Sequence, residues 1–271
     1  MTVQRQHGQA GFALLVVLAV VGLLALLSSQ MIAAGRAALH EAAALRERAM
    51  NEAAADGAVN VGLLRLFQEP DVMARRSLTA SIGGRIVSVA FEDETRKINP
   101  NLASQSLMSA LLRVLGADPP NAAALAREIV DWRSPGVSSA DGGLKIDRYR
   151  AAGLSYGPAG RLFRTIDELG LLPGMTPALL ARLRPHLCLY LDNPANARNA
   201  SPVVALALEE AAMDPSAPDD LIFLIPEQVV TVRAMVRGSG QTRFTRSAIV
   251  RLPPRGGRAQ PVAQILTWIG G

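Results

Sequence analysis

The side chains that most often carry catalysis or bind transition metals are few in this chain of 271 residues. The three histidines are His7, His40 and His186, and none lies near a serine, cysteine or carboxylate at a spacing typical of a catalytic triad. No pair of histidines has the spacing of a zinc site. Cys188 is the single cysteine, which excludes an internal disulfide and indicates a buried, apolar role. We therefore expect no enzymatic activity.

A second pattern with chemical consequences lies at the N-terminus, where a short basic leader ends in Gly11 and an apolar run begins at Phe12. No polar residue occurs from there to Leu27, and Arg36 is the first charge beyond the run. At ~1.5 Å per residue, the uncharged residues 12–35 span roughly the 30 Å thickness of a bilayer's hydrocarbon core. We expect them to form the membrane-spanning half of an N-terminal helix.

Three interpretations of this segment are open from its residues alone. It can be an ordinary signal anchor that keeps its N-terminus inside the cell. It can be a removable secretory signal cut near Ala33-Ala34-Gly35, although its apolar run is longer than such signals usually have. It can also be a prepilin-type leader cut between Gly11 and Phe12, in which case the apolar segment stays in the mature protein.

The helix is expected to continue well beyond the apolar run. No proline precedes Pro70, and residues 12–68 are rich in Ala, Leu, Glu and Arg, which favour helix. In the second half, small or apolar residues recur at steps of three, four or seven, which indicates an amphipathic helix. These residues are Ala43, Met50, Ala54, Gly57, Val61 and Leu64. A coiled-coil stalk would show a similar stripe, but alanine and glycine make a weak zipper, so we expect packing against a sheet.

The rest of the chain changes between strand and helix patterns twice. A β-branched run with a Gly-Gly turn signal predicts a strand over residues 81–92. Short helical segments broken by proline and glycine then follow from Ile98 to about Leu208. The predicted helices are residues 104–115, 121–132, 165–170 and 176–187, with Asn121 and Thr176 as N-caps. The predicted later strands are residues 229–236, 242–252 and 262–269. A large helical block therefore interrupts an antiparallel sheet.

The charge composition says little about partners. The formal net charge is +5, and arginine supplies nearly all of the positive charge because Lys97 and Lys145 are the only lysines. This bias accompanies a high content of Ala and Gly, which is typical of a GC-rich genome. It does not indicate a nucleic-acid-binding surface.

Several short motifs are more informative in their order and spacing than singly. They are Gly11-Phe12, residues 93–101 (Asp-Glu-Thr-Arg-Lys-Ile-Asn-Pro-Asn), residues 129–132 (Ile-Val-Asp-Trp), Asp167-Glu168-Leu169, Leu172-Pro173-Gly174-Met175 and Trp268. In the second motif we expect Asn99 and Asn101 to end the strand and cap the first helix of the insert. Over nearly its whole length the chain resembles the type II secretion minor pseudopilin K family, also called general secretion pathway protein K.

The resemblance implies an α+β, pilin-like fold in which a long N-terminal helix packs on an antiparallel sheet with a large all-helical insert. It implies a leader at residues 1–11, a transmembrane half at 12–35, a pilin-like domain at 36–92 and 209–271, and an insert domain at 93–208. The implied function is that of a minor pseudopilin that initiates and caps the pseudopilus for protein export across the outer membrane. A minor pilin of a type IV pilus is the close alternative.

By the same resemblance, prepilin peptidase would cut after Gly11, and the new amine of Phe12 would be methylated. The product would be a single-pass inner-membrane protein with its C-terminal domain in the periplasm and other minor pseudopilins as partners. In pilin-like subunits the fifth mature residue is usually a glutamate that pairs with a neighbour's amine, whereas here it is Val16. A subunit without that carboxylate needs no amine above it, so Val16 fits a tip position and also an ordinary membrane helix.

Members of the family resemble calcium-binding proteins, with an Asp-Trp-x-Asp-x-Asp run and a Gly-x-Glu element that supply oxygen ligands. In this chain Ser134 and Gly136 stand at two of the acidic positions, and Lys145 stands where the glutamate is expected. Arg148 adds a further charge that would repel a cation. The acidic residues that remain are Asp131, Asp141 and Asp147. We expect calcium binding to be weakened or absent, and no other cofactor.

Residues 169–177 resemble a helix-hairpin-helix, a module that binds the DNA backbone through hairpin amides. The module normally has a second glycine, but here Gly174-Met175 is followed by Thr176-Pro177, which removes that glycine and one amide. A membrane-anchored DNA-uptake protein is therefore the alternative of a different class. We expect no nucleic-acid partner.

Overall fold

The computed structural model describes residues 7–69, 71–214, 228–238, 243–253 and 263–270. Most of the predicted leader, residues 1–6, lies outside them, as do residue 242 of the strand predicted over 242–252 and residue 262 of the last predicted strand. The fold is the expected α+β one: a long N-terminal helix, a five-stranded antiparallel sheet and a helical insert.

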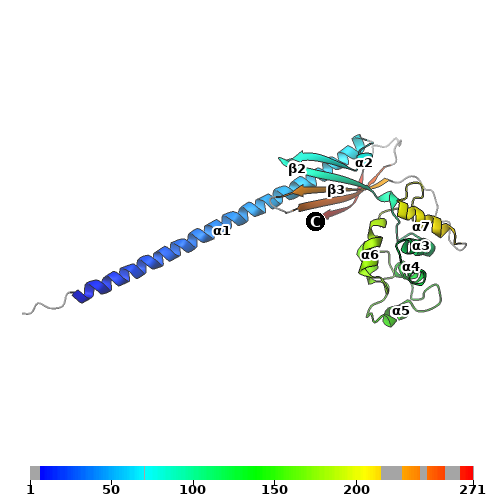
Figure 1. Cartoon of the computed structure of the whole chain (residues 1–271), viewed down its shortest axis with the longest axis horizontal. Helices are drawn as coiled ribbons and strands as arrows, with labels where there is room; N and C mark the ends of the chain where they lie inside the picture. Colours follow the sequence, from blue (N-terminus) through cyan, green and yellow to red (C-terminus); the bar gives the residue numbers. More distant parts are fainter. Residues whose placement is uncertain (1–6, 70, 215–227, 239–242, 254–262, 271) are drawn as a thin grey trace, which may run out of the picture.

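Helix α1 runs from His7 to Gln68, 62 residues, or ~90 Å at the rise of an α-helix. Figure 1 shows its first half projecting far from the rest of the protein. The large apolar side chains of this half, from Phe12 to Ile32, are exposed. By length and composition α1 contains a segment able to cross a membrane.

The second half of α1 packs against the sheet, as expected, but its buried face coincides only in part with the predicted stripe. The buried face consists of Asn51, Ala54, Ala55, Ala58, Val59, Gly62 and Leu66. Met50 and Leu64 of the predicted stripe are 43% and 53% exposed. Ala54 of the predicted stripe is buried, and a Cβ added at Gly57 would lie 3.3 Å from Ile82, so the prediction was correct for these two small residues and wrong for the larger Met50 and Leu64. A Cβ added at Gly62 would lie 2.8 Å from Val232 Cγ1, so a larger residue does not fit there.

The sheet has the strand order β1-β2-β3-β4-β5, and every neighbouring pair is antiparallel. The strands are β1 (Ser77–Ile82), β2 (Arg85–Asp93), β3 (Gln228–Arg237), β4 (Arg243–Leu252) and β5 (Gln264–Gly270). Gly83 and Gly84, both with positive φ, form a two-residue turn between β1 and β2, so the single strand predicted over 81–92 is a hairpin. The prediction missed β1 because its sequence, Ser-Leu-Thr-Ala-Ser-Ile, has few large apolar residues.

The insert lies between β2 and β3, which are neighbours in the sheet although more than a hundred residues separate them. Short helix α2 (Val72–Arg75) precedes the sheet. The insert contains η1 (Glu94–Arg96), α3 (Gln105–Val114), α4 (Pro119–Arg133), α5 (Lys145–Ala151), η2 (Ile166–Leu171), α6 (Pro177–Leu183), η3 (Arg184–His186) and α7 (Pro202–Ala212). These helices enclose a hydrophobic core of their own, separate from the core between α1 and the sheet. In Figure 1 they lie beyond the end of the sheet that is farthest from the N-terminus.

Several local details of the insert differ from the predictions. Asp118, not Asn121, is the N-cap of α4, since its carboxylate accepts the backbone N–H of Asn121 at 3.2 Å. Thr176 does cap α6. Helix α7 packs against α3 and runs through the predicted boundary at 208/209, so the insert continues to Ala212.

Candidate functional site

The predicted processing and assembly residues all lie on one uninterrupted helix. Gly11, Phe12 and Val16 belong to α1, and the side chains of Phe12 and Val16 are 71% and 46% exposed. No polar side chain occurs from Phe12 to Leu27, and the Ser28 hydroxyl just beyond donates to the carbonyl of Leu24 at 2.8 Å. This half of α1 therefore presents an apolar surface without an unbonded hydroxyl at that position.

Residues 93–101 form the junction between the sheet and the insert. At its start, the Asp93 carboxylate accepts the backbone N–H of Thr95 at 3.0 Å and the side-chain amide of Asn199 at 2.7 Å. Asn199 also donates to the Thr95 hydroxyl at 2.8 Å. These bonds tie the entry of the insert to the residues just before α7, near its return.

Asn99 and Asn101 hold distant parts of the insert together. The Asn99 amide donates to the carbonyl of Leu191 at 2.7 Å, while the Asn101 side chain forms a reciprocal pair of bonds with the backbone of Phe163 at 3.0 and 2.8 Å. The predicted roles were wrong: β2 ends at Asp93, and Ser104 caps α3. The sequence signal was correct in type, since asparagine bonds backbone groups, but the partners lie 62 and 92 residues away.

Lys97 is the charged centre of the junction. Its ammonium pairs with Glu92 at 2.7 Å and with the buried Glu94 at 2.9 Å. Glu94 also accepts the hydroxyl of Thr231 on β3 at 2.6 Å. Burial alone would lower the pKa of Lys97, but the charges and hydrogen bonds of Glu94 and Glu92 outweigh burial and raise it. No sequence pattern pointed to this cluster.

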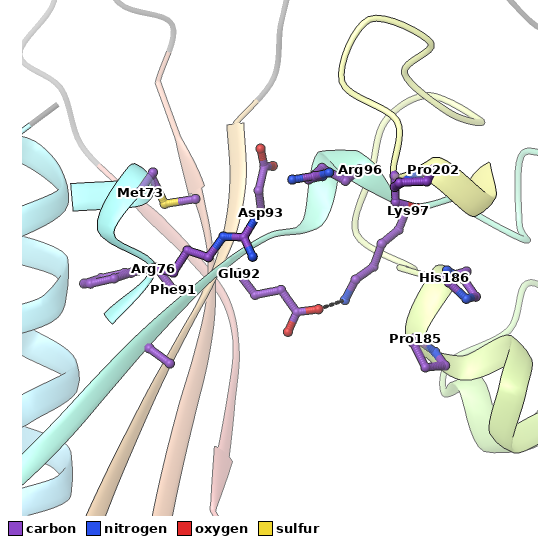
Figure 2. Close-up of a pocket in the computed structure, with 12 residues that line it drawn as sticks. Met73, Arg76, Phe91, Glu92, Asp93, Arg96, Lys97, Pro185, His186 and Pro202 are labelled. Carbon is purple, nitrogen blue, oxygen red and sulfur yellow. Dashed lines mark ion pairs between the residues drawn. The ribbon is translucent and has the colours of Figure 1, made fainter. Parts of the chain in front are cut away.

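A pocket of about 650 Å³ opens at this junction. Figure 2 shows Glu92 reaching toward Lys97 across it, with Pro185 and His186 of the insert on the far side. The two lining carboxylates, Glu92 and Asp93, are already bonded to Lys97 and Asn199. Burial, and secondarily Lys97, lowers the pKa of His186. The ion pairs and hydrogen bonds of this pocket join the sheet to the insert, and among its described lining residues no nucleophile lies beside a base.

A second charged cluster lies between the end of α4 and the start of α5. The Lys145 ammonium donates to the carbonyls of Asp131 and Ser134 at 3.0 and 2.8 Å. The Arg148 guanidinium pairs with Asp131 and with Glu128, and it lies 3.6 Å from Asp141. Burial raises the pKa of Glu128, an effect that Arg148 opposes. The Gly143 N–H lowers the pKa of Asp141.

The comparison with known proteins identifies the region that contains both clusters. Residues 86–192, from β2 to the end of the insert's central helices, match the family model described as type II secretion system protein K. The match covers most of the insert and strand β2, which is less than half of the 271 residues. No curated protein sequence gives a match.

A solved structure shares the fold. It is a chain of the crystal structure titled the GspK-GspI-GspJ complex from the enterotoxigenic Escherichia coli type 2 secretion system. The TM-score is 0.62 and the sequence identity is 14%, with 86% of this chain and 99% of that chain covered. The pilin-like arrangement of long helix, sheet and helical insert is therefore shared, although few residues are.

The acidic residues expected at the family's calcium position do not form a suitable site here. Asp131 and Asp141 both face Arg148, whereas Asp147 is exposed and pairs with Arg150 at 3.5 Å. Among the described residues, no group of three or more His, Cys, Asp and Glu side chains is arranged to hold a metal ion. Glu128 Oε2 is buried without a partner, but its other oxygen is bound to Arg148. The donor set therefore does not fit calcium.

The segment resembling a helix-hairpin-helix buries Leu169 and Leu172 in the core of the insert, whereas its two glycines, Gly170 and Gly174, are exposed. A Cβ at Gly174 would lie 3.4 Å from Asn121 Oδ1 and 3.8 Å from Leu125, so the turn faces α4. Arg184, just after α6, pairs with Asp167. The expectation that the chain has no nucleic-acid partner stays a prediction. Cys188 is buried, as expected, and burial raises its pKa to about 12.

Proposed function

We propose that this chain is a minor pseudopilin of a type II secretion system, with a mechanical role and no catalytic one. The observation that carries the proposal is the division of α1. Its first half exposes apolar side chains continuously, while its second half is fixed on a sheet that carries an insert of the protein K family. A subunit built this way can be anchored in a membrane and then join a helical bundle.

Membrane insertion follows from the first half of α1. Cleavage between Gly11 and Phe12 would leave the apolar segment at the start of the mature chain, as a single span of the inner membrane with the folded domains in the periplasm. The apolar surface that lies against lipid must be covered when the helix leaves it, because exposing it to water is unfavourable. The equivalent helices of other minor pseudopilins supply that cover. The structural relative comes from a complex of three different proteins, which supports partners of this kind.

A tip position accounts for Val16 and for the placement of the insert. A glutamate in hydrocarbon is stable only when paired, and Val16 requires no amine from a subunit above it. The insert lies at the far end of the molecule from the N-terminus of α1 (Figure 1). A subunit with such a head would block the addition of another subunit on top, so it would start and cap the pseudopilus.

The mature N-terminus tests the proposal. The full-length chain is expressed with its own secretion genes, including prepilin peptidase, and the membrane-bound protein is analysed by intact mass and N-terminal peptide sequencing. We expect a chain that begins at a methylated Phe12, and a Gly11→Val variant that stays uncut. A chain that begins near Arg36 would show conventional signal removal, and intact Met1 would show a plain anchor; either result contradicts the proposal.

Assembly is tested by co-purification from the same membranes. We expect the wild-type chain to bring other minor pseudopilins with it after mild detergent extraction, and a chain lacking residues 12–35 to lose them. A Val16→Glu variant should still enter the membrane but reduce secretion, because it introduces a carboxylate for which the tip offers no amine. Unchanged secretion by this variant would contradict the proposal that the chain lies at the tip of the pseudopilus.

A further inference from the structure

The buried lysine of the insert closes the end of a helix. Lys145 is 2% exposed, and its ammonium donates to the carbonyls of Asp131, in the last turn of α4, and of Ser134, the C-cap of α4. The last carbonyls of an α-helix lack partners within the helix and carry the negative end of its dipole. A fixed ammonium at this position satisfies both the hydrogen bonding and the electrostatics.

The side chains around Lys145 are balanced in charge. Arg148 binds Asp131 and Glu128 and lies near Asp141, and Arg127 pairs with Asp141 at 3.1 Å. The Ser139 hydroxyl donates to Asp131 and fixes the loop between the two helices. The three carboxylates (−3) are therefore matched by Lys145, Arg127 and Arg148 (+3), and the local sum is zero.

From this arrangement we propose that the insert is held together by its own cations and is independent of calcium. In the family a divalent cation is expected to join this loop to the end of α4. Here the Lys145 ammonium and the Arg148 guanidinium make that connection. The local charge is already balanced and the carbonyls already accept hydrogen bonds, so the binding of a calcium ion there would not be favourable. The inference does not depend on the proposed function.

The fluorescence of Trp132 can report on the charged cluster around Lys145. It follows Asp131, is 4% exposed and stacks on Phe163 with 5.7 Å between ring centres. The other tryptophan is Trp268 on β5. In a Trp268→Phe background, the fluorescence of Trp132 reports on the insert alone, within the full-length chain in detergent.

The first test is the thermal midpoint of the Trp132 signal in calcium and in EDTA. We expect the same midpoint in both conditions, and no terbium luminescence sensitised by Trp132 when Tb³⁺ replaces calcium. A midpoint that rises by several degrees in calcium, or terbium luminescence that saturates and is displaced by calcium, would overturn the proposal. This test needs no variant at the cluster, so it holds even if substitutions there prevent folding.

The second test compares two substitutions of the same lysine. Lys145→Met keeps the length of the side chain but leaves the two carbonyls without a donor, and we expect its midpoint to fall by about 5 °C or more with no recovery in calcium. Lys145→Glu changes the local sum to −2, and we expect a larger fall in EDTA that calcium partly reverses. Arg150→Glu, an exposed change on the same helix, is the control and should leave the response to calcium unchanged. A Lys145→Met protein with an unchanged midpoint, or a folded Lys145→Glu protein that calcium does not stabilise, would contradict the proposal.

Discussion

The junction at Lys97 and the insert loop at Lys145 both place a lysine ammonium away from water, but they provide different partners for its charge. These are the two lysines of a chain with 28 basic residues; Lys145 is buried, and 13% of the Lys97 side chain is exposed. Lys97 neutralises the carboxylates of Glu92 and Glu94, whereas Lys145 donates to backbone carbonyls at the end of a helix. A compact ammonium fits such small enclosed spaces, while the planar guanidinium of arginine needs room for its fork.

The difference shows which buried charges depend on each other. At the junction the lysine and the acids form an isolated ion group, so removing the cation leaves a buried anion without compensation. In the loop, Arg148 and Arg127 pair directly with the acids, and Lys145 balances the remaining charge while its hydrogen bonds go to backbone carbonyls. The junction should therefore be the more sensitive of the two to loss of its lysine, a ranking that is tested by comparing Lys97→Met with Lys145→Met.

The largest effect is expected from Lys97→Met. It leaves Glu94, whose side chain is 5% exposed, without its cation, and should lower the free energy of unfolding by about 3 kcal/mol. Urea unfolding of the full-length chain, followed by near-ultraviolet circular dichroism, measures the loss. The control is Arg184→Ala, which breaks the exposed pair with Asp167 and should cost less than about 0.5 kcal/mol. Equal effects of the two substitutions would show that the junction is not stabilised by its buried charges.

A smaller effect is expected from Asn99→Ala, which tests whether the junction also depends on neutral bonds. It removes the buried amide that donates to Leu191 and accepts the N–H of Asn101, at a cost of about 2 kcal/mol. Hydrogen exchange should be faster at the amides around residues 99–101 and 188–192 and unchanged in β3. Asn196→Ala, which breaks one local bond to the N–H of Arg198, is the control. Uniform acceleration across the sheet would mean that Asn99 stabilises the whole fold.

The smallest effect is a dependence on pH through His186. Because burial and Lys97 lower its pKa in the folded state, the unfolded chain binds the proton more readily as the pH falls. The stabilisation that depends on a neutral His186 is complete above pH ~6.5, the ordinary pKa of histidine. It is lost as the pH falls through the lowered pKa of the folded state. Unfolding midpoints between pH 5 and 8 should show a slope that His186→Gln reduces and that His40→Gln, on the exposed part of α1, retains. A slope unchanged by His186→Gln would place its origin elsewhere.

Features of the structure that depend on nearby residues were predictable. The long helix follows from the absence of proline and from good helix formers, and the predicted cap Thr176 accepts the backbone N–H of a residue three positions ahead. The segments of strand and helix, and the interruption of the sheet by the insert, follow from changes of periodicity. The replacement of acidic residues by Lys145 was also visible, although the motif could say only that it opposes calcium.

The amino-acid sequence thus determined the elements and the chemical character of each site, because propensity, capping and periodicity act over a few residues. The tertiary structure alone decided which face of α1 is buried, which carbonyl each asparagine reaches, and that Lys145 closes the end of α4. Each of these depends on groups brought together from distant positions, as when Thr231 meets Glu94 or Leu191 meets Asn99. Such partners are chosen by packing and by the need to satisfy buried polar groups, and neither leaves a local pattern in the chain.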